Sequence, residues 1–464
     1  MGNLHPSIFR AYDIRGVVPE EITEDVAERV GRAMVIHTRA TTVLVGRDMR
    51  TSSPALAEAV MRGVTAQGAD VIDIGLCSTP MFNYAVASDA VVPRAARDHG
   101  TIAGIMVSAS HNPAKYNGFK LDYGDALPVS AVTGMEEVKR LALAPFSPSH
   151  REGERGGVGS VTMANVLDSY LSHITSLLDP ATLPPTRMVV CCGNGMGGLT
   201  MPRLAPKIPG DVIALHWELD GSFPNHEANP IKLENVRDLA DAVRDAGAAV
   251  GFAYDGDADR LGVVDERGEL VRGDLVAVLL AREVLRERPG SRILCDVRAS
   301  RACAESVTES GGVSETTRVG HALIKKHLRE TGAVFAGELS GHFYFDQFYG
   351  VECTELAMLM VLRLLARERR PLSEIVAPFV RYAYSGEVNF TVADPPEAIR
   401  ELEARYASAA RSISKLDGVQ FDMGDWWFLV RPSNTVPLVR LIVETPTQRA
   451  TDARVEEIAA VIRG

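Results

Sequence analysis

The chain has 464 residues, of which 46% are apolar and 23% are charged, and its formal net charge is −11. These values are typical of a globular protein large enough for about three or four domains. The negative charge argues against nucleic acid or an anionic membrane as a partner, because both favour a basic surface. No apolar run approaches the roughly 18 residues that a membrane-spanning helix needs.

The cysteines and the start of the chain favour a cytoplasmic location. The six cysteines are scattered, and no two of them form a CxxC pair. Most lie in apolar segments, so we expect buried free thiols in a reducing compartment. The opening "MGNLHPSIFRAYDIRG" lacks the apolar core of a signal peptide. No pattern indicates an obligate protein partner.

Short β-branched segments alternate with amphipathic helical segments along most of the chain. The pattern predicts βαβ units, and therefore an α/β fold with mixed, largely parallel sheets. Strands are expected at 41–48, 69–75, 104–110, 187–192, 211–219, 248–257, 261–266, 292–297, 312–320 and 333–340, with helices at 54–68 and 79–88. Three blocks of similar size follow one another, so we expect three related α/β domains.

The C-terminal part of the chain has a different texture. The segments 385–392, 418–433 and 438–446 read as antiparallel strands around two helices, a smaller α+β module. We therefore expect four domains, at 1–152, 153–269, 270–377 and 378–464.

The segment "VSASHNPAKYNGFK" (107–120) presents a serine on a loop at a strand end. Ser110 stands beside His111, a possible proton carrier, and Asn-Pro then forces the chain out of regular structure. Lys120 closes the segment. A hydroxyl held in this way is a candidate nucleophile.

The segment "AYDGDADRLGVVDE" (253–266) carries Asp255, Asp257 and Asp259 at alternate positions after an apolar strand. Three such carboxylates can converge on one hard divalent cation, and Mg²⁺ suits phosphoryl chemistry. An EF-hand calcium loop is disfavoured, because Arg260 occupies the position that needs glycine and strands flank the segment. An acidic surface turn is the remaining alternative.

The segment "CCGNGMGGLT" (191–200) has G-x-G-x-x-G spacing after a strand, with Glu218 twenty residues after the third glycine. This spacing is the dinucleotide fingerprint, so an NAD-dependent dehydrogenase is a rival hypothesis. Three prolines in the following segment, 199–210, argue against the long helix that the fingerprint requires. A glycine-rich turn without a ligand is favoured.

The segment "AGELSGHFYF" (336–345) places Glu338, Ser340 and His342 on a glycine-flanked loop. Alternate side chains of an extended segment point the same way. A carboxylate, a hydroxyl and an imidazole in a row suit recognition of sugar hydroxyls. A polar turn that caps a helix is the alternative.

Two further segments carry arginines. "VRPSNTVPLVR" (430–440) offers a guanidinium, two hydroxyls and exposed backbone amides on a turn, which suit a phosphate clamp. The residues of this expected clamp are Arg431, Ser433, Asn434 and Thr435.

The segment "FRAYDIRG" (9–16) contains Tyr12 and Arg15. By itself it indicates only a core tyrosine and a surface arginine.

Taken together and in this order, these motifs resemble those of the α-D-phosphohexomutase family, closest to its bacterial phosphomannomutase/phosphoglucomutase branch. The resemblance runs from "FRAYDIRG" to "RPSNTVP", essentially the whole chain. It implies three related α/β domains and a smaller α+β domain around a central cleft.

The resemblance also implies a role for each motif. Ser110 would carry the phosphoryl group and, with the three aspartates, hold Mg²⁺. Catalytic roles would fall to Ser110, His111, Lys120 as general base, Arg15 and His342. Substrate contacts would come from Tyr12, Arg260, His321, Glu338, Ser340, Arg431, Ser433, Asn434 and Thr435.

The implied reaction is reversible transfer of a phosphoryl group between C6 and C1 of a hexose phosphate, through a phosphoserine and a hexose 1,6-bisphosphate, which also acts as activator. Mannose phosphate is the first expected substrate and glucose phosphate the second. Phosphoglucosamine mutase is the nearest alternative, and a dehydrogenase or an inactive sugar-phosphate-binding protein is more distant.

Three residues depart from the family pattern, of which Ser108, in place of the commoner threonine, is a minor change. Leu339 stands where mannose/glucose mutases often have methionine and glucosamine mutases usually have glutamine. Arg298 replaces a frequent lysine, and a guanidinium cannot act as a base near neutral pH.

Overall fold

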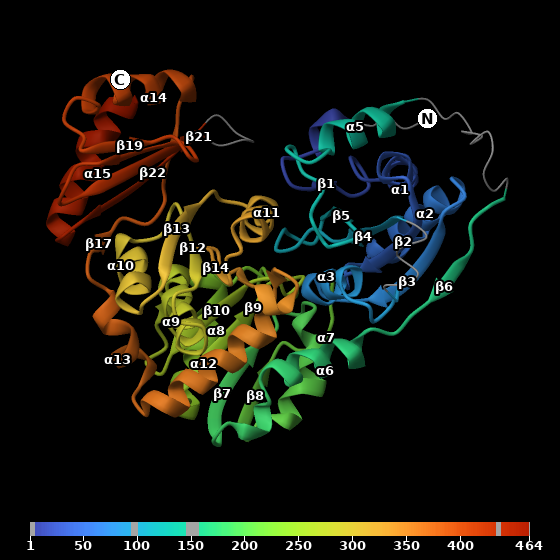
Figure 1. Cartoon of the computed structure of the whole chain (residues 1–464), viewed down its shortest axis with the longest axis horizontal. Coiled ribbons are helices and arrows are strands. Elements are labelled where there is room, and N and C mark those ends of the chain that lie inside the picture. Colours follow the sequence, from blue (N-terminus) through green and yellow to red (C-terminus); the bar gives the residue numbers. More distant parts are fainter. Residues whose placement is uncertain (1–4, 94–100, 145–156, 433–437, 464) are drawn as a thin grey trace.

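Four sheets organise the chain in this computed structural model, which describes residues 5–93, 101–144, 157–432 and 438–463. The domains, numbered here by their sheets, form an open arc with the first and fourth at its two ends (Figure 1). The first three sheets share one plan: parallel strands on one side and antiparallel strands on the other. The prediction of three related α/β domains and a different fourth one is confirmed.

The first domain has a six-stranded sheet in the order β1-β5-β4-β2-β3-β6. Its last strand, β6, lies beyond residue 152 and still pairs with β3, so this sheet reaches into the segment expected to begin the second domain. Its elements are β1 Ile14–Val17, α1 Glu24–Thr38, β2 Ala40–Arg47, α2 Ser53–Thr65, β3 Asp70–Leu76, α3 Thr79–Ala87, β4 Thr101–Val107, β5 Tyr116–Tyr123, α5 Met135–Leu143 and β6 Val161–Met163.

The second domain has a five-stranded sheet in the order β11-β10-β9-β7-β8. Its helix α7 contains one proline, Pro202, and ends two residues before the next, so the prolines keep this helix short, as the sequence predicts. The elements are α6 Leu167–Leu177, β7 Thr186–Cys191, α7 Gly197–Leu204, β8 Gly210–Leu215, α8 Arg237–Ala246, β9 Val250–Tyr254, β10 Leu261–Asp265 and β11 Leu270–Val271.

The third domain repeats the plan with the strand order β13-β12-β14-β15-β16. Its helix α12 is buried along most of its length, which explains its apolar sequence "TELAMLMVLRLL". The elements are α9 Gly273–Glu287, β12 Arg292–Asp296, α10 Arg301–Glu309, β13 Val313–Thr317, α11 His321–Thr331, β14 Phe335–Gly337, β15 Phe343–Phe345, β16 Val351–Glu352, α12 Thr354–Glu368 and α13 Leu372–Val376.

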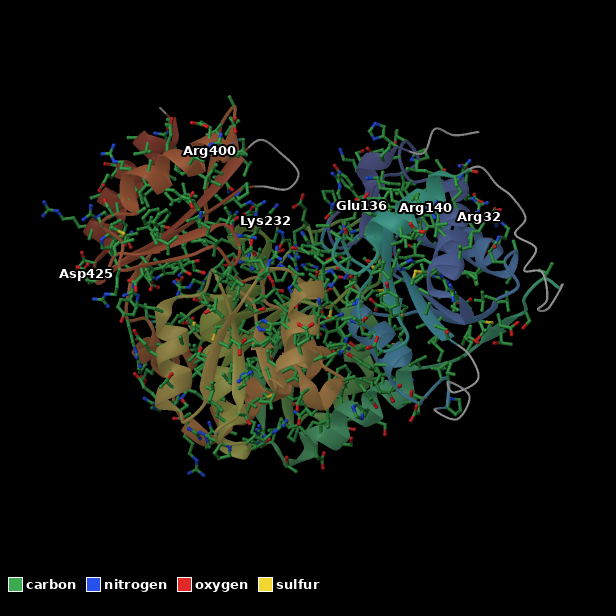
Figure 2. All side chains as sticks on the ribbon, turned by 45° about the horizontal axis from the view of Figure 1, so that its top comes forward. Arg32, Glu136, Arg140, Lys232, Arg400 and Asp425 are labelled. Atoms are coloured by element: carbon green, nitrogen blue, oxygen red, sulfur yellow. The ribbon has the colours of Figure 1, made fainter. Side chains whose placement is uncertain are left out.

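The fourth domain has an antiparallel sheet, β17-β22-β21-β20-β19, to which β18 adds by pairing with β22. Two helices, α14 and α15, complete it, as predicted. The elements are β17 Ala383–Tyr384, β18 Val388–Thr391, α14 Pro395–Tyr406, β19 Ser412–Ser414, β20 Val419–Asp422, β21 Trp427–Pro432, β22 Leu438–Thr445 and α15 Gln448–Arg463. In Figure 2, Arg400 and Asp425 of this domain lie on the opposite side of the view from Glu136 and Arg140 of the first domain.

The apolar cores show which domains pack against one another. One continuous cluster of buried side chains includes Phe82 of the first domain, Phe252 of the second and Phe335 of the third. The fourth domain has a core of its own, built around Phe421 and Phe428. The first three domains therefore share one apolar core, whereas the fourth meets the third through a smaller cluster that contains Val297 and Trp427.

The shared plan places three loops at the same topological position. In each of the first three domains, one loop connects the last parallel strand to the first antiparallel strand: 108–115 between β4 and β5, 255–260 between β9 and β10, and 338–342 between β14 and β15. These loops carry the serine, the aspartates and the sugar-binding candidates. None of the described helices is both long and apolar enough to cross a membrane.

Candidate active site

Ser110 lies just beyond the end of β4 in a left-handed backbone conformation, with φ of 52°. Its side chain is almost fully buried, and Oγ donates to Oδ2 of Asp255 at 2.9 Å. Nδ1 of His111 lies 3.2 Å from the same hydroxyl. A strained, buried serine between a carboxylate and an imidazole is positioned for reaction.

Arg50, which no sequence motif marks, binds the backbone of the loop that carries Ser110. The guanidinium is fully buried and donates to the carbonyl oxygens of Ser110 at 2.8 Å, Pro113 at 2.9 Å and Tyr116 at 3.0 Å. Asp48 pairs with it at 3.2 Å. Both residues follow β2, whose carboxyl end lies beside that of β4, and that shared sheet edge was the available signal.

Asp255, Asp257 and Asp259 converge after β9. All three are buried, and one oxygen of each lies within 4.8 Å of the others. Oδ1 of Asp257 is buried without a hydrogen-bond partner among the described residues, and Oδ1 of Asp259 has Nε2 of His342 as its neighbour at 3.2 Å. Buried carboxylate oxygens left unpaired in this way fit a hard cation such as Mg²⁺. The flanking elements are strands, so the EF-hand reading is excluded.

Lys120 lies among these carboxylates. Its Nζ is 2.7 Å from Oδ2 of Asp257 and 2.6 Å from Oδ2 of Asp259. Burial opposes its charge, but the two carboxylates prevail and raise the pKa of Lys120 above its ordinary value. The ammonium group thus neutralises part of the cluster. Lys120 can act as a base only after this ammonium group has lost a proton, which the two carboxylates oppose.

The same cluster contains the other cations expected near the serine. Arg15 donates to Asp13 at 2.7 Å and to the side chain of Asn112 at 2.8 Å, so it braces the serine loop. The backbone amide of Arg260 donates to Oδ1 of Asp255 at 3.1 Å. Burial, helped by these two arginines, lowers the pKa of His111 well below its ordinary value. His111 is therefore a neutral imidazole.

His342 connects the loop of the third domain to the aspartates of the second. Its Nε2 lies 3.2 Å from Oδ1 of Asp259, and its Nδ1 lies 3.0 Å from Oε2 of Glu338 and 2.9 Å from Oγ of Ser340. Burial disfavours its charge, but the two carboxylates raise the pKa of His342 to about 9. A protonated imidazole here can donate a proton or hold an anionic group.

Glu338 is fixed by several donors. The hydroxyl of Tyr344 donates to it at 2.8 Å and the amide of Gly320 at 3.2 Å. Arg298 lies 3.5 Å from Glu338 and forms a closer pair with Asp296. Held between two carboxylates, Arg298 supplies positive charge at the place where the family often has lysine.

A second group of residues joins the first, third and fourth domains. The hydroxyl of Tyr12 donates to the carbonyl of Val319 at 3.1 Å, and its ring packs edge-on against His321 at 5.9 Å. Nε2 of His321 is buried without a hydrogen-bond partner in the described chain. Such an unpaired nitrogen suits a polar ligand.

The arginine of the expected phosphate clamp is bound by a carboxylate. Arg431 donates to both oxygens of Asp417, at 3.1 and 3.2 Å. Asp417 also accepts from the amide of Val319 at 2.8 Å, so it links the fourth domain to the third. Asp417 could not be predicted from the sequence, because no local pattern marks it. Ser433, Asn434 and Thr435 lie outside the described residues.

The glycine-rich segment 191–200 is explained by packing. A methyl group on Gly195 would lie 2.7 Å from the carbonyl of Gly256, and one on Gly198 would lie 1.9 Å from the carbonyl of Trp217. Protein backbone therefore occupies the space that a pyrophosphate would need, and the dehydrogenase hypothesis loses its support.

Comparisons with known proteins identify the family of the chain. Four family models match in order: phosphoglucomutase/phosphomannomutase alpha/beta/alpha domains I (6–142), II (168–268) and III (272–382), and the C-terminal domain (387–461). A protein of Xanthomonas campestris named "Phosphohexose mutases" is 37% identical and covers 98% of this chain and 99% of its own.

Two further comparisons extend along the whole chain. The phosphomannomutase/phosphoglucomutase of Pseudomonas aeruginosa is 36% identical, over 99% of this chain and 95% of its own. The crystal structure of a phosphoglucomutase/phosphomannomutase family protein from Burkholderia thailandensis superposes with a TM-score of 0.87 at 32% identity, over 99% of this chain and 97% of that one.

Proposed function

Because this chain belongs to the phosphoglucomutase/phosphomannomutase family, we propose that it catalyses reversible transfer of a phosphoryl group between C6 and C1 of a hexose monophosphate. One observation carries the proposal: the buried hydroxyl of Ser110 is 2.9 Å from Asp255, in the cluster that also contains Lys120. Phosphoryl transfer depends mainly on positioning and charge stabilisation, and this cluster offers both.

Mg²⁺ is the proposed metal. Asp255, Asp257, Asp259 and a phosphate on Ser110 would hold it, which fits the unpaired buried oxygen of Asp257 and the close approach of the three carboxylates. When bound, the cation supplies positive charge to the transferring phosphoryl group. With Asp257 and Asp259 engaged by the cation, burial of Lys120 would dominate and lower the pKa of its ammonium group below the ordinary value, so that the neutral amine could accept a proton.

The first transfer uses phosphorylated Ser110 as donor. The free hydroxyl of the sugar attacks phosphorus, the bond from phosphorus to the serine oxygen breaks, and the hydroxyl proton passes to the neutral amine of Lys120, which returns it to the released serine oxygen. Arg15 and the protonated His342 lie beside the same carboxylates and stabilise the charge that develops. The product is a hexose 1,6-bisphosphate, which also serves as activator because it can phosphorylate a free Ser110.

The second transfer returns the other phosphate to Ser110, so the bisphosphate must turn over between the two steps. Arg431, with Ser433, Asn434 and Thr435, would grip the phosphate that is not reacting. Arg431 must exchange Asp417 for that phosphate, which we expect to accompany rotation of the fourth domain. Glu338, Ser340, Arg260, His321 and Tyr12 would contact the sugar and its phosphates.

Mannose phosphate is the first proposed substrate and glucose phosphate the second. The two sugars differ only at C2, whereas a carboxylate such as Glu338 would bind hydroxyls that both share. Leu339 matches neither mannose/glucose mutases nor glucosamine mutases, so glucosamine phosphate stays the alternative substrate. The six free cysteines are compatible with the proposed cytoplasmic location.

The test follows mannose, glucose and glucosamine 1-phosphates together by ³¹P NMR, with Mg²⁺ and a trace of hexose 1,6-bisphosphate. We expect the mannose ester to become the 6-phosphate, with or without the glucose ester. Ser110→Ala should abolish turnover, whereas Ser172→Ala, an exposed serine on α6, should not change it. Full turnover by Ser110→Ala would refute the phosphoserine mechanism, and conversion of glucosamine alone would assign the other substrate.

A further inference from the structure

A cysteine and two histidines meet on the second domain, on the far side of the glycine-rich turn from the aspartates. Cys191 ends β7, His216 follows β8, and His226 lies in the loop beyond it. One nitrogen of each imidazole and the sulfur of Cys191 all lie within 4.8 Å of one another. None of these residues belongs to the site described above.

The distance between Cys191 and His226 fits a metal. Sγ of Cys191 lies 3.6 Å from Nε2 of His226. Tetrahedral zinc, with bonds of about 2.3 Å to sulfur and about 2.0 Å to nitrogen, separates two such ligands by about 3.5 Å. Nδ1 of His226 lies 2.9 Å from the carbonyl of Glu227. Donation from Nδ1 to that carbonyl leaves the lone pair of Nε2 directed at the sulfur, the usual arrangement of a zinc-binding histidine.

His216 provides a second, independent observation. It is a non-glycine residue with φ of 52°, a conformation that L-residues seldom adopt. Its Nε2 is shielded from solvent and has no hydrogen-bond partner among the described residues, although Oδ2 of Asp238 lies 3.5 Å from it, within ion-pair distance. Backbone strain and an unpaired buried nitrogen at one residue are typical of a ligand site.

We propose that Cys191, His216 and His226, with Asp238 beside them, form a binding site for one zinc ion. Sulfur and imidazole ligands select zinc over Mg²⁺, whereas the three aspartates offer oxygen alone. The two sites are therefore chemically separate, although the turn between them packs on Gly256.

Zinc would fix the two ends of the loop from His216 to His226. Within this loop, a methyl group on Gly221 would lie 2.5 Å from Cα of Arg50, so the two backbones touch. The ring of Phe223 lies 5.0 Å from the guanidinium of Arg50. Since Arg50 holds the carbonyl of Ser110, the zinc ion stabilises the support of the serine loop without contacting substrate.

The first experiment uses Co²⁺ as a spectroscopic probe. Reduced full-length protein, washed with chelator, is titrated with Co²⁺ in excess Mg²⁺. We expect a thiolate-to-cobalt charge-transfer band that saturates at one equivalent and disappears when Zn²⁺ is added. An all-oxygen site cannot produce this band. Its absence from the wild type would overturn the proposal and leave a simple hydrogen bond between thiol and imidazole.

Variants assign the ligands. Cys191→Ser should abolish the band, and His226→Gln should weaken Co²⁺ affinity by at least about tenfold. Cys295→Ser, which removes a partly exposed thiol of the third domain, is the matched control and should keep the band. A band of equal intensity in Cys191→Ser would refute the assignment.

Thermal unfolding supplies a readout that does not depend on Cys191. Zn²⁺ should raise the melting temperature of the wild type and of Cys295→Ser, and should leave His216→Gln and His226→Gln unchanged. An equal rise in all four proteins would refute the site. Because neither readout measures turnover, failure here leaves the proposed mutase function untouched, and failure of that function leaves the zinc site untouched.

Discussion

Replacing Gly256 by alanine tests whether contact between two loops positions the serine. Gly256 lies between Asp255 and Asp257, and a methyl group there would come 2.4 Å from the carbonyl of Ser110, where ordinary contact begins at 3.4 Å. The two loops must therefore separate by about 1 Å. A misplacement of about 1 Å costs on the order of 100-fold in rate, or about 2.7 kcal/mol of activation free energy.

Alanine is tolerated by the backbone at this position, because Gly256 is not in the left-handed region. The assay compares kcat and KM for mannose 1-phosphate, with melting temperature as a check on folding. Gly157→Ala is the control, since nothing lies within 4 Å of its added methyl group. In Gly195→Ala the added methyl group would lie 2.7 Å from the carbonyl oxygen of Gly256. This variant should therefore also have a lower kcat. Activity of Gly256→Ala within about threefold of the wild type would refute the reasoning, because a 1 Å shift predicts a far larger loss.

Two further predictions concern charged groups. The raised pKa of His342, about 9 without metal, stabilises the fold fully below its unfolded value of about 6.5 and less as pH rises through 9. We therefore expect the difference in unfolding free energy between the wild type and His342→Gln to shrink by up to about 3 kcal/mol over this pH interval. Urea titrations in the presence of chelator measure this difference. A difference that stays constant with pH would contradict the assignment. Arg431→Lys should raise KM about tenfold by losing a bidentate contact. The neighbouring Arg440→Lys, paired with Glu387, should not, and equal effects would argue against the clamp.

The sequence predicts best those site residues that come directly after a strand. Ser110, Asp255 and Glu338 each stand in a loop between the last parallel and the first antiparallel strand of a domain. A cluster of polar residues directly after an apolar segment can be recognised in the sequence alone. The three loops contact one another in space, because Ser110 donates to Asp255 and His342 lies 3.2 Å from Asp259.

Other parts of the site could not be predicted, because they depend on contacts between distant segments. Thr79 donates to Asp257 across 178 positions of sequence at 2.6 Å. Arg50 resembles any arginine in a polar turn until its carbonyl partners are known. Asp417 has no motif at all, and only the fold brings it to Arg431. The boundary proposed near residue 152 likewise depends on β6, a short strand that joins the first sheet after a long connection.

The separate core of the fourth domain has a consequence for protein engineering. Its apolar contact with the third domain is small, built around Val297, Trp427, Leu429 and Ile442. Exchanging residues from about 383 onward with those of a relative would leave the core shared by the other three domains intact and change only this small contact. Such chimaeras would exchange the residues proposed to bind the non-reacting phosphate. The reacting serine, the aspartates and the sugar-binding loop would stay unchanged.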